Sequence, residues 1–152
     1  LFRYLALKNN PIATSNGAVK VIKEFWKSKG LPVEQLFMYD GSGLSPVNAV
    51  SANFFVELLM YMKTKSKNNA IFFNSLPVAG ESGTLSSFLK NSALQGKLHA
   101  KSGTISRVKC YAGYINLKEK TYVFSLMVNN PNGSSKAVTK KMEEFLLSAC
   151  AE

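Results

Sequence analysis

The sequence predicts an α+β fold in which helices pack on an antiparallel sheet. Residues 1–92 carry several stretches with apolar side chains at helical spacing, and the period then changes to three consecutive apolar, β-branched runs between residues 97 and 130. Residues 135–152 return to helical spacing. Helices followed by a strand meander and a closing helix are typical of the α+β class. Because no internal repeat or low-complexity tract interrupts the pattern, we expect residues 1–152 to form part of one domain.

The first half of the chain predicts three helical segments. The opening "LFRYLAL" has helical spacing but no capping residue before it. Residues 18–29 form an amphipathic pattern with Ser15 or Asn16 as the expected cap, and Gly30 and Pro32 end it. Its apolar positions are Val19, Ile22, Phe25 and Trp26. Residues 53–65 predict a further helix whose methionine and aromatic side chains are core material.

The second half predicts the sheet and its covering elements. Residues 72–92 begin irregularly and become a helix near Thr84, with Leu85, Phe88 and Leu89 facing inward. The runs 97–105, 109–117 and 121–130 predict three antiparallel strands, the last two joined by a turn at 118–120. The final helix is expected to bury one face, made of Val138, Met142, Phe145, Leu146 and Ala149.

Composition and charge exclude several classes of protein. Of 152 residues, 46% are hydrophobic, which excludes a disordered or fibrous chain. No run of about 18 apolar residues is present, so no membrane span is expected. The opening residues lack a signal-peptide cleavage pattern. Because the chain starts with Leu rather than Met and its opening helical stretch has no cap, we expect residue 1 to be a boundary made by cleavage or truncation. The net charge of +10 favours anionic partners in general without choosing among them.

Two cysteines and one histidine do not form a metal-binding pattern. Cys110 lies in an apolar strand and Cys150 in the last helix, and neither has Cys-x-x-Cys or Cys/His spacing. Free thiols are expected, with a bridge between strand and helix as the alternative in an oxidising compartment. No metal and no cofactor are expected.

The stretch "HAKSGTIS" (99–106) carries the most informative motif. Lysine, hydroxyl residue and glycine form the third element of the serine acyl-transferase signature, whose other elements are Ser-x-x-Lys and Ser-x-Asn. Strand alternation places Lys101 and Gly103 on one face and Ser102 and Thr104 on the other. Gly103 allows a substrate backbone to lie close to an edge strand. Lys101 and Ser102 are candidates for holding a carboxylate, and the Thr104 N–H for donating to an oxyanion.

Two further loops have the same glycine-rich character. In "YDGSGLSPVN" (39–48), Asp40 can cap the turn and Leu44 stands at its tip, although an ordinary turn with Ser45 or Asn48 capping the next helix is an equal alternative. The second loop is "LPVAGESGTL" (76–85).

Together the three stretches resemble the class C low-molecular-mass penicillin-binding proteins, which are serine D-alanyl-D-alanine carboxypeptidases and endopeptidases of peptidase family S13. The resemblance covers essentially the whole chain, in order and approximate spacing. It implies the C-terminal portion of a β-lactamase/transpeptidase-like domain. It also implies that the Lys-Ser-Gly strand borders the active-site groove and that the "DGSGL" loop lines it.

Carried over to this sequence, the resemblance implicates seven residues. Lys101 and Thr104 are expected in the catalytic machinery. The expected substrate-binding residues are Ser42, Leu44, Ser102, Gly103 and Ser106, with Leu44 as an apolar wall. The implied parent reaction is acylation of a serine by a D-alanyl-D-alanine peptide followed by hydrolysis, and β-lactams would be trapped at the acyl stage.

The nucleophile of the family has no positional match in this chain. Ser87–Lys90 fits Ser-x-x-Lys and Ser51–Asn53 fits Ser-x-Asn, but their order is reversed. Phe88 and Leu89 take the core side of their segment, and Ser51 is expected to cap a helix. We therefore expect the nucleophile and general base to lie upstream of residue 1, and the isolated piece to be inactive.

The resemblance also implies partners and a location. Peptidoglycan stem peptides and β-lactams are expected to bind the full-length parent, outside the cytoplasmic membrane or in the periplasm, and a surface exposed by truncation could self-associate. The alternative is a noncatalytic module that binds peptidoglycan or a protein. Nucleic-acid binding is not expected, because no basic and aromatic interleaving accompanies the charge.

Overall fold

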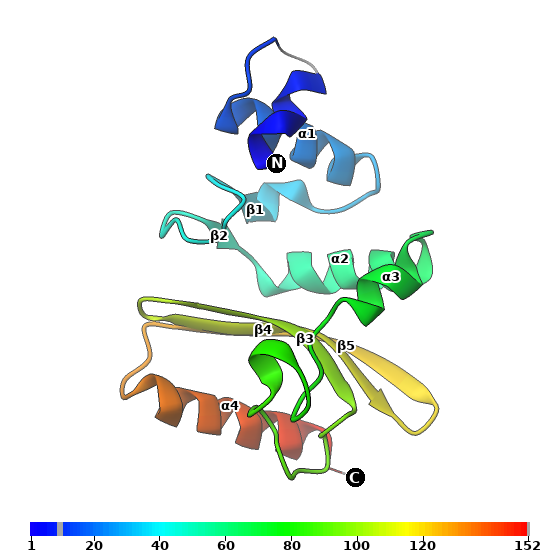
Figure 1. Cartoon of the computed structure of the whole chain (residues 1–152), viewed down its shortest axis with the longest axis vertical. Coiled ribbons are helices and arrows are strands. Elements are labelled where there is room, and N and C mark those ends of the chain that lie inside the picture. The colour runs from blue at the N-terminus through cyan, green and yellow to red at the C-terminus, as the bar shows by residue number, and fades with distance from the viewer. Residues whose placement is uncertain (9–10, 152) are drawn as a thin grey trace. The chain divides into compact units, whose positions relative to one another are not determined.

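The computed structural model describes residues 1–8 and 11–151 and has the predicted α+β class (Figure 1). The chain divides into two compact units, Leu1–Leu58 and Leu59–Glu152. Each unit is described by itself below.

The first unit contains helices and one short hairpin. Its elements are η1 (Phe2–Lys8, 3-10), α1 (Ser15–Lys27), η2 (Val33–Gln35, 3-10), β1 (Leu36–Phe37), β2 (Ala49–Val50) and the start of α2 (Ala52–Thr64). The cap of α1 is Thr14, whose Oγ1 accepts the Gly17 N–H at 3.0 Å, so the expectation of Ser15 or Asn16 was wrong by one residue or two. Ser51 caps α2 as expected, because its Oγ accepts the Phe54 N–H at 3.0 Å.

The second unit is built around a three-stranded antiparallel sheet in the order β3-β4-β5. Besides the end of α2, its elements are α3 (Asn69–Asn74), η3 (Gly83–Leu85, 3-10), β3 (Leu98–Ile105), β4 (Val108–Leu117), β5 (Lys120–Asn129) and α4 (Ser135–Ala149). Two-residue turns join the strands, since Ile105 pairs with Val108 and Leu117 with Lys120. The predicted meander is confirmed.

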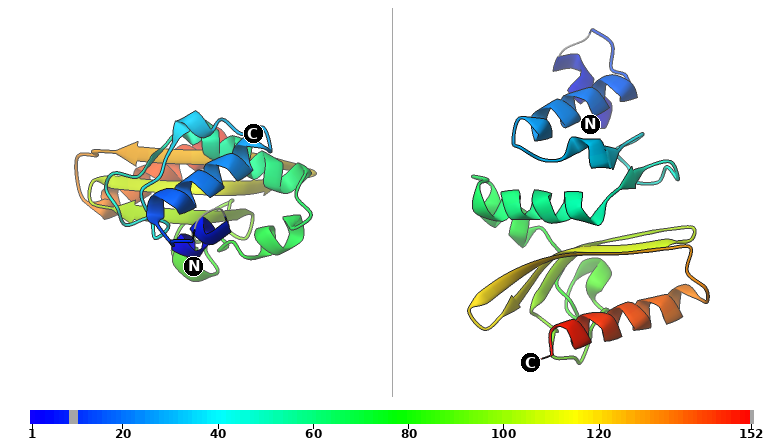
Figure 2. Two further views of the ribbon diagram at one scale, coloured as in Figure 1. Left: turned by 90° about the horizontal axis from the view of Figure 1, so that it is seen from above. Right: turned by 180° about the vertical axis from the view of Figure 1, so that it is seen from behind.

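Different elements cover the two faces of this sheet. One face packs against α4 and the segment after η3, through a core that includes Leu85, Leu98, Tyr111 and Met142. The other face meets the end of α2 and α3, where the Tyr114 hydroxyl donates to the Leu59 carbonyl at 2.8 Å. Figure 1 and Figure 2 show α4 along one side of the sheet and α3 on the other. β3 therefore has one side chain face in each core.

Two details of the second unit differ from prediction. No α-helix forms between η3 and β3, because Leu89 and Asn91 have φ angles of 55° and 58° that interrupt helical backbone. Leu85, Phe88 and Leu89 are nevertheless buried, as predicted. On α4, Val138, Met142 and Leu146 are buried, but Phe145 is 59% exposed and Ala149 is also exposed, so these two are not core residues.

Within residues 1–8 and 11–151, no helix has the length and apolar content needed to cross a membrane.

Candidate functional site

One edge of β3 is open along the Lys-Ser-Gly-Thr motif. Near the start of the strand, the segment before η3 covers this edge: the Ala79 N–H donates to the Leu98 carbonyl at 2.9 Å, and the Ala100 N–H donates to the Pro77 carbonyl at 3.0 Å. Alternation in an antiparallel strand directs the backbone groups of Ser102 and Thr104 to the same edge. Among the described residues, no other element's backbone bonds to them there. The edge can therefore accept an extended peptide as an added strand.

Lys101 and Gly103 share one sheet face, as the alternation predicted, and it is the face opposite α4. The Lys101 ammonium donates to the Ser102 carbonyl, so its charge is held beside the open edge. Gly103 is opposite Cys110 on β4, and a Cβ built on Gly103 would approach the Cys110 Sγ to 2.6 Å. The Cys110 thiol also donates to the Gly103 carbonyl at 3.6 Å. A side chain at position 103 would therefore crowd the Cys110 sulfur on β4.

Ser102 and Thr104 lie on the other face. The Ser102 hydroxyl donates to the Thr84 hydroxyl oxygen at 2.8 Å, which joins the motif strand to the "SGTL" part of the second glycine-rich loop. The exposed Thr104 follows, and its N–H points to the open edge by the same alternation as Ser102. A carboxylate or oxyanion at this edge would meet a lysine, a hydroxyl and a backbone donor.

Ser106 lies in the two-residue turn between β3 and β4. It is exposed, and its neighbour Arg107 has a φ of 63°. The Asn130 N–H donates to the Arg107 carbonyl at 2.7 Å, which holds the turn against the end of β5. Ser106 is therefore at the end of the open edge and available to a ligand that extends past Thr104.

Ser42 and Leu44 belong to the first unit, in a loop organised by Asp40. The Asp40 carboxylate accepts the Ser42 hydroxyl at 2.9 Å, the Gly43 N–H at 3.0 Å and the Asn48 amide at 2.8 Å. These hydrogen bonds hold the pKa of Asp40 below its usual value, and the bond from Asn48 contributes most. The predicted capping role of Asp40 is confirmed, whereas neither Ser45 nor Asn48 caps α2. Leu44 is 74% exposed at the loop tip.

The two chance matches to catalytic motifs are not catalytic arrangements. Ser51 is occupied as the cap of α2 and also donates to the Gln35 side chain. Ser87 and Lys90 are exposed, while Phe88 and Leu89 between them are buried, as predicted. The φ of 55° at Leu89 also prevents Ser87 and Lys90 from sharing a helix face.

Burial shifts the pKa values of two β3 and β4 side chains near the motif, Cys110 and His99. Burial raises the pKa of the Cys110 thiol, although the positive charge of Lys101 partly opposes the rise. Burial lowers the pKa of His99, whose ring is tilted by 33° against that of Phe73 with ring centroids 4.3 Å apart. Both cysteines are free, as expected. Neither thiol has the lowered pKa of a reactive nucleophile.

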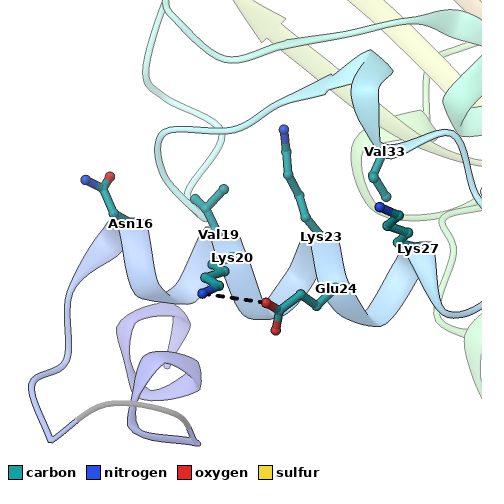
Figure 3. A pocket seen from close by; sticks show the side chains of 7 residues that line it. All are labelled: Asn16, Val19, Lys20, Lys23, Glu24, Lys27 and Val33. Atoms are coloured by element: carbon teal, nitrogen blue, oxygen red, sulfur yellow. Dashed lines mark ion pairs between the residues drawn. The ribbon is translucent and has the colours of Figure 1, made fainter.

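A shallow depression on the first unit runs along α1 (Figure 3). It is lined by Lys20, Lys23, Lys27, Val19 and Val33, and Lys20 pairs with Glu24 at 3.9 Å on its rim. None of the predicted site residues lines it. In the part of the chain that the structure describes, no three His, Cys, Asp or Glu side chains are grouped so that they could hold a metal ion.

The sequence did not identify Thr84 as a site residue. The glycine-rich loop that contains Thr84 is one of the three family motifs, but the apolar spacing predicts that Thr84 begins a helix. The contact between Thr84 and Ser102 joins residues 18 positions apart, which no local pattern predicts. The pairing of residues 77–79 with β3 was also missed, because a Pro-containing segment with one isolated bridge lacks a strand pattern.

Comparison with known proteins identifies the family. Residues 1–149 match the model of the D-Ala-D-Ala carboxypeptidase 3 (S13) family. A D-alanyl-D-alanine carboxypeptidase of Actinomadura sp. (strain R39) is 35% identical over 117 residues, which are 74% of this chain and 22% of that protein. A penicillin-sensitive carboxypeptidase A of Dictyostelium discoideum is 25% identical over 124 residues, which are 77% of this chain and 24% of that protein.

Solved structures share the fold. Penicillin-binding protein 4 of Haemophilus influenzae superposes with a TM-score of 0.85 at 24% identity, over 97% of this chain and 35% of that one. A predatory endopeptidase of Bdellovibrio bacteriovorus, solved with an immunity protein, gives a TM-score of 0.73 at 19% identity, over 98% of this chain and 43% of that one. The chain spans less than a quarter of the length of the Actinomadura and Dictyostelium carboxypeptidases. It belongs to the D-Ala-D-Ala carboxypeptidase 3 (S13) family.

Proposed function

We propose that this chain is the C-terminal part of a serine D-alanyl-D-alanine carboxypeptidase or endopeptidase, and that β3 aligns the peptide to be cleaved. The observation that carries the proposal is the open edge of β3 beside Lys101, Ser102 and Thr104, in a chain of the S13 family. A peptide ending in D-alanyl-D-alanine offers both an extended backbone and a terminal carboxylate, which are the groups this edge can bind.

Each motif residue has a role in this proposal. Lys101 supplies positive potential and contacts the Ser-x-Asn serine of the parent, and the Ser102 hydroxyl binds the substrate carboxylate. The Thr104 N–H donates to the oxyanion that develops as the acyl-enzyme forms. Gly103 leaves room for the peptide backbone, and Ser106 binds the ligand beyond the edge. For Ser42 and Leu44, in the Asp40 loop of the first unit, substrate contact stays a prediction from the family resemblance, with Leu44 as an apolar contact.

The chemistry itself needs a serine that we propose is supplied by residues outside 1–152. The serine attacks the D-alanyl-D-alanine bond, D-alanine leaves, and water then cleaves the serine ester. With a β-lactam the ring opens on the same serine and the ester persists. We propose that the parent works outside the cytoplasmic membrane, where its peptidoglycan substrate is found.

Labelling with a fluorescent penicillin tests this proposal. The label should attach to the full product of the gene and survive denaturation, but it should not attach to the isolated 152-residue chain. A covalent label on the isolated chain would contradict the external nucleophile. No label on either protein, with no cleavage of a D-alanyl-D-alanine peptide, would contradict the peptidase function.

The same open edge supports one alternative, a noncatalytic module that binds peptidoglycan peptides. It predicts saturable binding of a muropeptide to the gene product that weakens on Lys101→Ala, without cleavage or penicillin labelling.

A further inference from the structure

Thr84, which lies outside the sheet, is bonded through its side chain to the motif strand. Its hydroxyl oxygen accepts the Ser102 hydroxyl at 2.8 Å, and the two side chains come from separate motifs, "SGTL" and "AKSGT". In the proposed function, the Ser102 hydroxyl binds the substrate carboxylate. The bond therefore places the Thr84 hydroxyl within hydrogen-bond distance of the hydroxyl that would contact the substrate.

The position of Thr84 is fixed by its neighbours. Leu85 is fully buried in the core below the sheet, and its carbonyl accepts the Gly80 N–H at 2.8 Å. The Ser82 hydroxyl oxygen accepts the Val78 N–H at 2.9 Å, and Ala79 is bonded to β3 itself. A β-branched side chain on such an anchored turn has few rotamers. The exposed Thr84 is therefore bonded to Ser102 from a turn whose backbone is anchored on both sides.

We infer that Thr84 is a positioning residue for carboxylate recognition by Ser102. A hydroxyl has one proton to donate and two lone pairs that accept. Without ligand, Ser102 donates its proton to Thr84. When a carboxylate binds, the Ser102 proton turns to the carboxylate and the Thr84 proton turns to the Ser102 oxygen. Each bond in such a chain polarises the next, so Ser102 becomes a stronger donor than an isolated serine.

The test uses the full gene product, because the inference rests on the proposed function. Thr84→Val keeps the shape but removes the hydroxyl, Thr84→Ser keeps the hydroxyl, and Ser86→Ala removes an exposed hydroxyl from the same loop as a control. For a D-alanyl-D-alanine peptide, Thr84→Val should raise KM roughly three- to tenfold with kcat little changed, which is the range of one ordinary hydrogen bond. Thr84→Ser and Ser86→Ala should stay near wild type.

Two further measurements separate positioning from a purely structural role. In a Ser102→Ala background, Thr84→Val should have no further effect on KM, since it acts only through Ser102. Acylation by the methyl ester of benzylpenicillin, which lacks the carboxylate, should be insensitive to Thr84→Val, whereas acylation by benzylpenicillin should slow. Thermal unfolding reports whether each variant folds, and Thr84→Ala replaces the valine variant if that one does not.

Several results would overturn the inference. An unchanged KM in Thr84→Val, an equal rise in the Ser102→Ala background, or an equal loss with the methyl ester would each show that Thr84 does not act on the carboxylate through Ser102. Failure of the proposed function is seen separately, in the wild type, as no cleavage and no acylation; the inference would then fall with it.

Discussion

At the scale of single residues, the motif strand depends on close neighbours that the motif does not include. Gly103 faces Cys110, and Ser102 is bonded to Thr84. The sequence predicted which residues of β3 share a face, because strand alternation is a local property. It did not predict these partners, because a contact between residues from different elements depends on register and loop path.

Replacing Gly103 by alanine should lower the free energy of unfolding by about 1 to 2 kcal/mol, because the new methyl group would overlap the Cys110 sulfur. Adding Cys110→Ala removes that sulfur and should recover most of the loss. Chemical denaturation of the two single variants and the double variant measures the coupling. Additive losses would show that the Cys110 sulfur is not what excludes a side chain at position 103.

At the scale of elements, the meander and the helix α4 were predictable, because each carries its own period and turn residues. The segment after Thr84 was not, because its buried side chains have helical spacing while left-handed backbone at Leu89 and Asn91 breaks the helix. Apolar spacing reports which side chains are buried and leaves the backbone conformation open. The spacing can also fail to predict burial. Phe145 has the spacing of a core residue on α4 and is exposed.

The turn between β3 and β4 should respond to changes in backbone preference. Arg107 has a φ of 63°, which costs a side-chain-bearing residue about 1 to 2 kcal/mol. Arg107→Gly should raise the free energy of unfolding by about 0.5 kcal/mol after the entropy of glycine is counted, and Arg107→Val should lower it by about 1 kcal/mol.

The control for this turn is Ser106→Gly. Ser106 does not have a positive φ, so glycine there should only lower stability. Denaturant unfolding of the three variants ranks their free energies of unfolding. Equal stability of Arg107→Gly and Arg107→Val would contradict the strain at Arg107.

At the scale of the whole molecule, Tyr114 connects the sheet to the middle of α2. Its hydroxyl donates to the Leu59 carbonyl at 2.8 Å, and burial raises its pKa to about 12. A tyrosine in the unfolded chain has a pKa of about 10, so the folded state favours the neutral form and loses this advantage as the pH rises from about 10 to about 12. The free energy of unfolding should fall over that interval.

Tyr114→Phe isolates this effect. The variant should be less stable at neutral pH by about 1 kcal/mol, because one hydrogen bond is lost, and its stability should fall less steeply above pH 10 than that of the wild type. Urea unfolding at a series of pH values measures both. Parallel curves for the two proteins would show that Tyr114 does not titrate in the way its burial implies.

The family and the fold class of the chain were both predictable from sequence, the first from three motifs in order and the second from periodicity. The candidate site was predictable only in its linear part, Lys101–Thr104. Its open edge results from residues 77–79 pairing with β3 as far as Ala100 and no further, which no residue pattern signals.

The motif strand is proposed to align the reacting peptide, and the rate of acylation by benzylpenicillin measures that alignment. In the full gene product, Lys101→Ala should lower the second-order rate constant about 100-fold or more, as the loss of one electrostatic stabiliser does in related chemistry. Lys97→Ala, which removes an exposed lysine just before β3, should leave it unchanged. Equal rate constants for Lys101→Ala and the wild type would contradict a role of the motif strand in aligning the peptide.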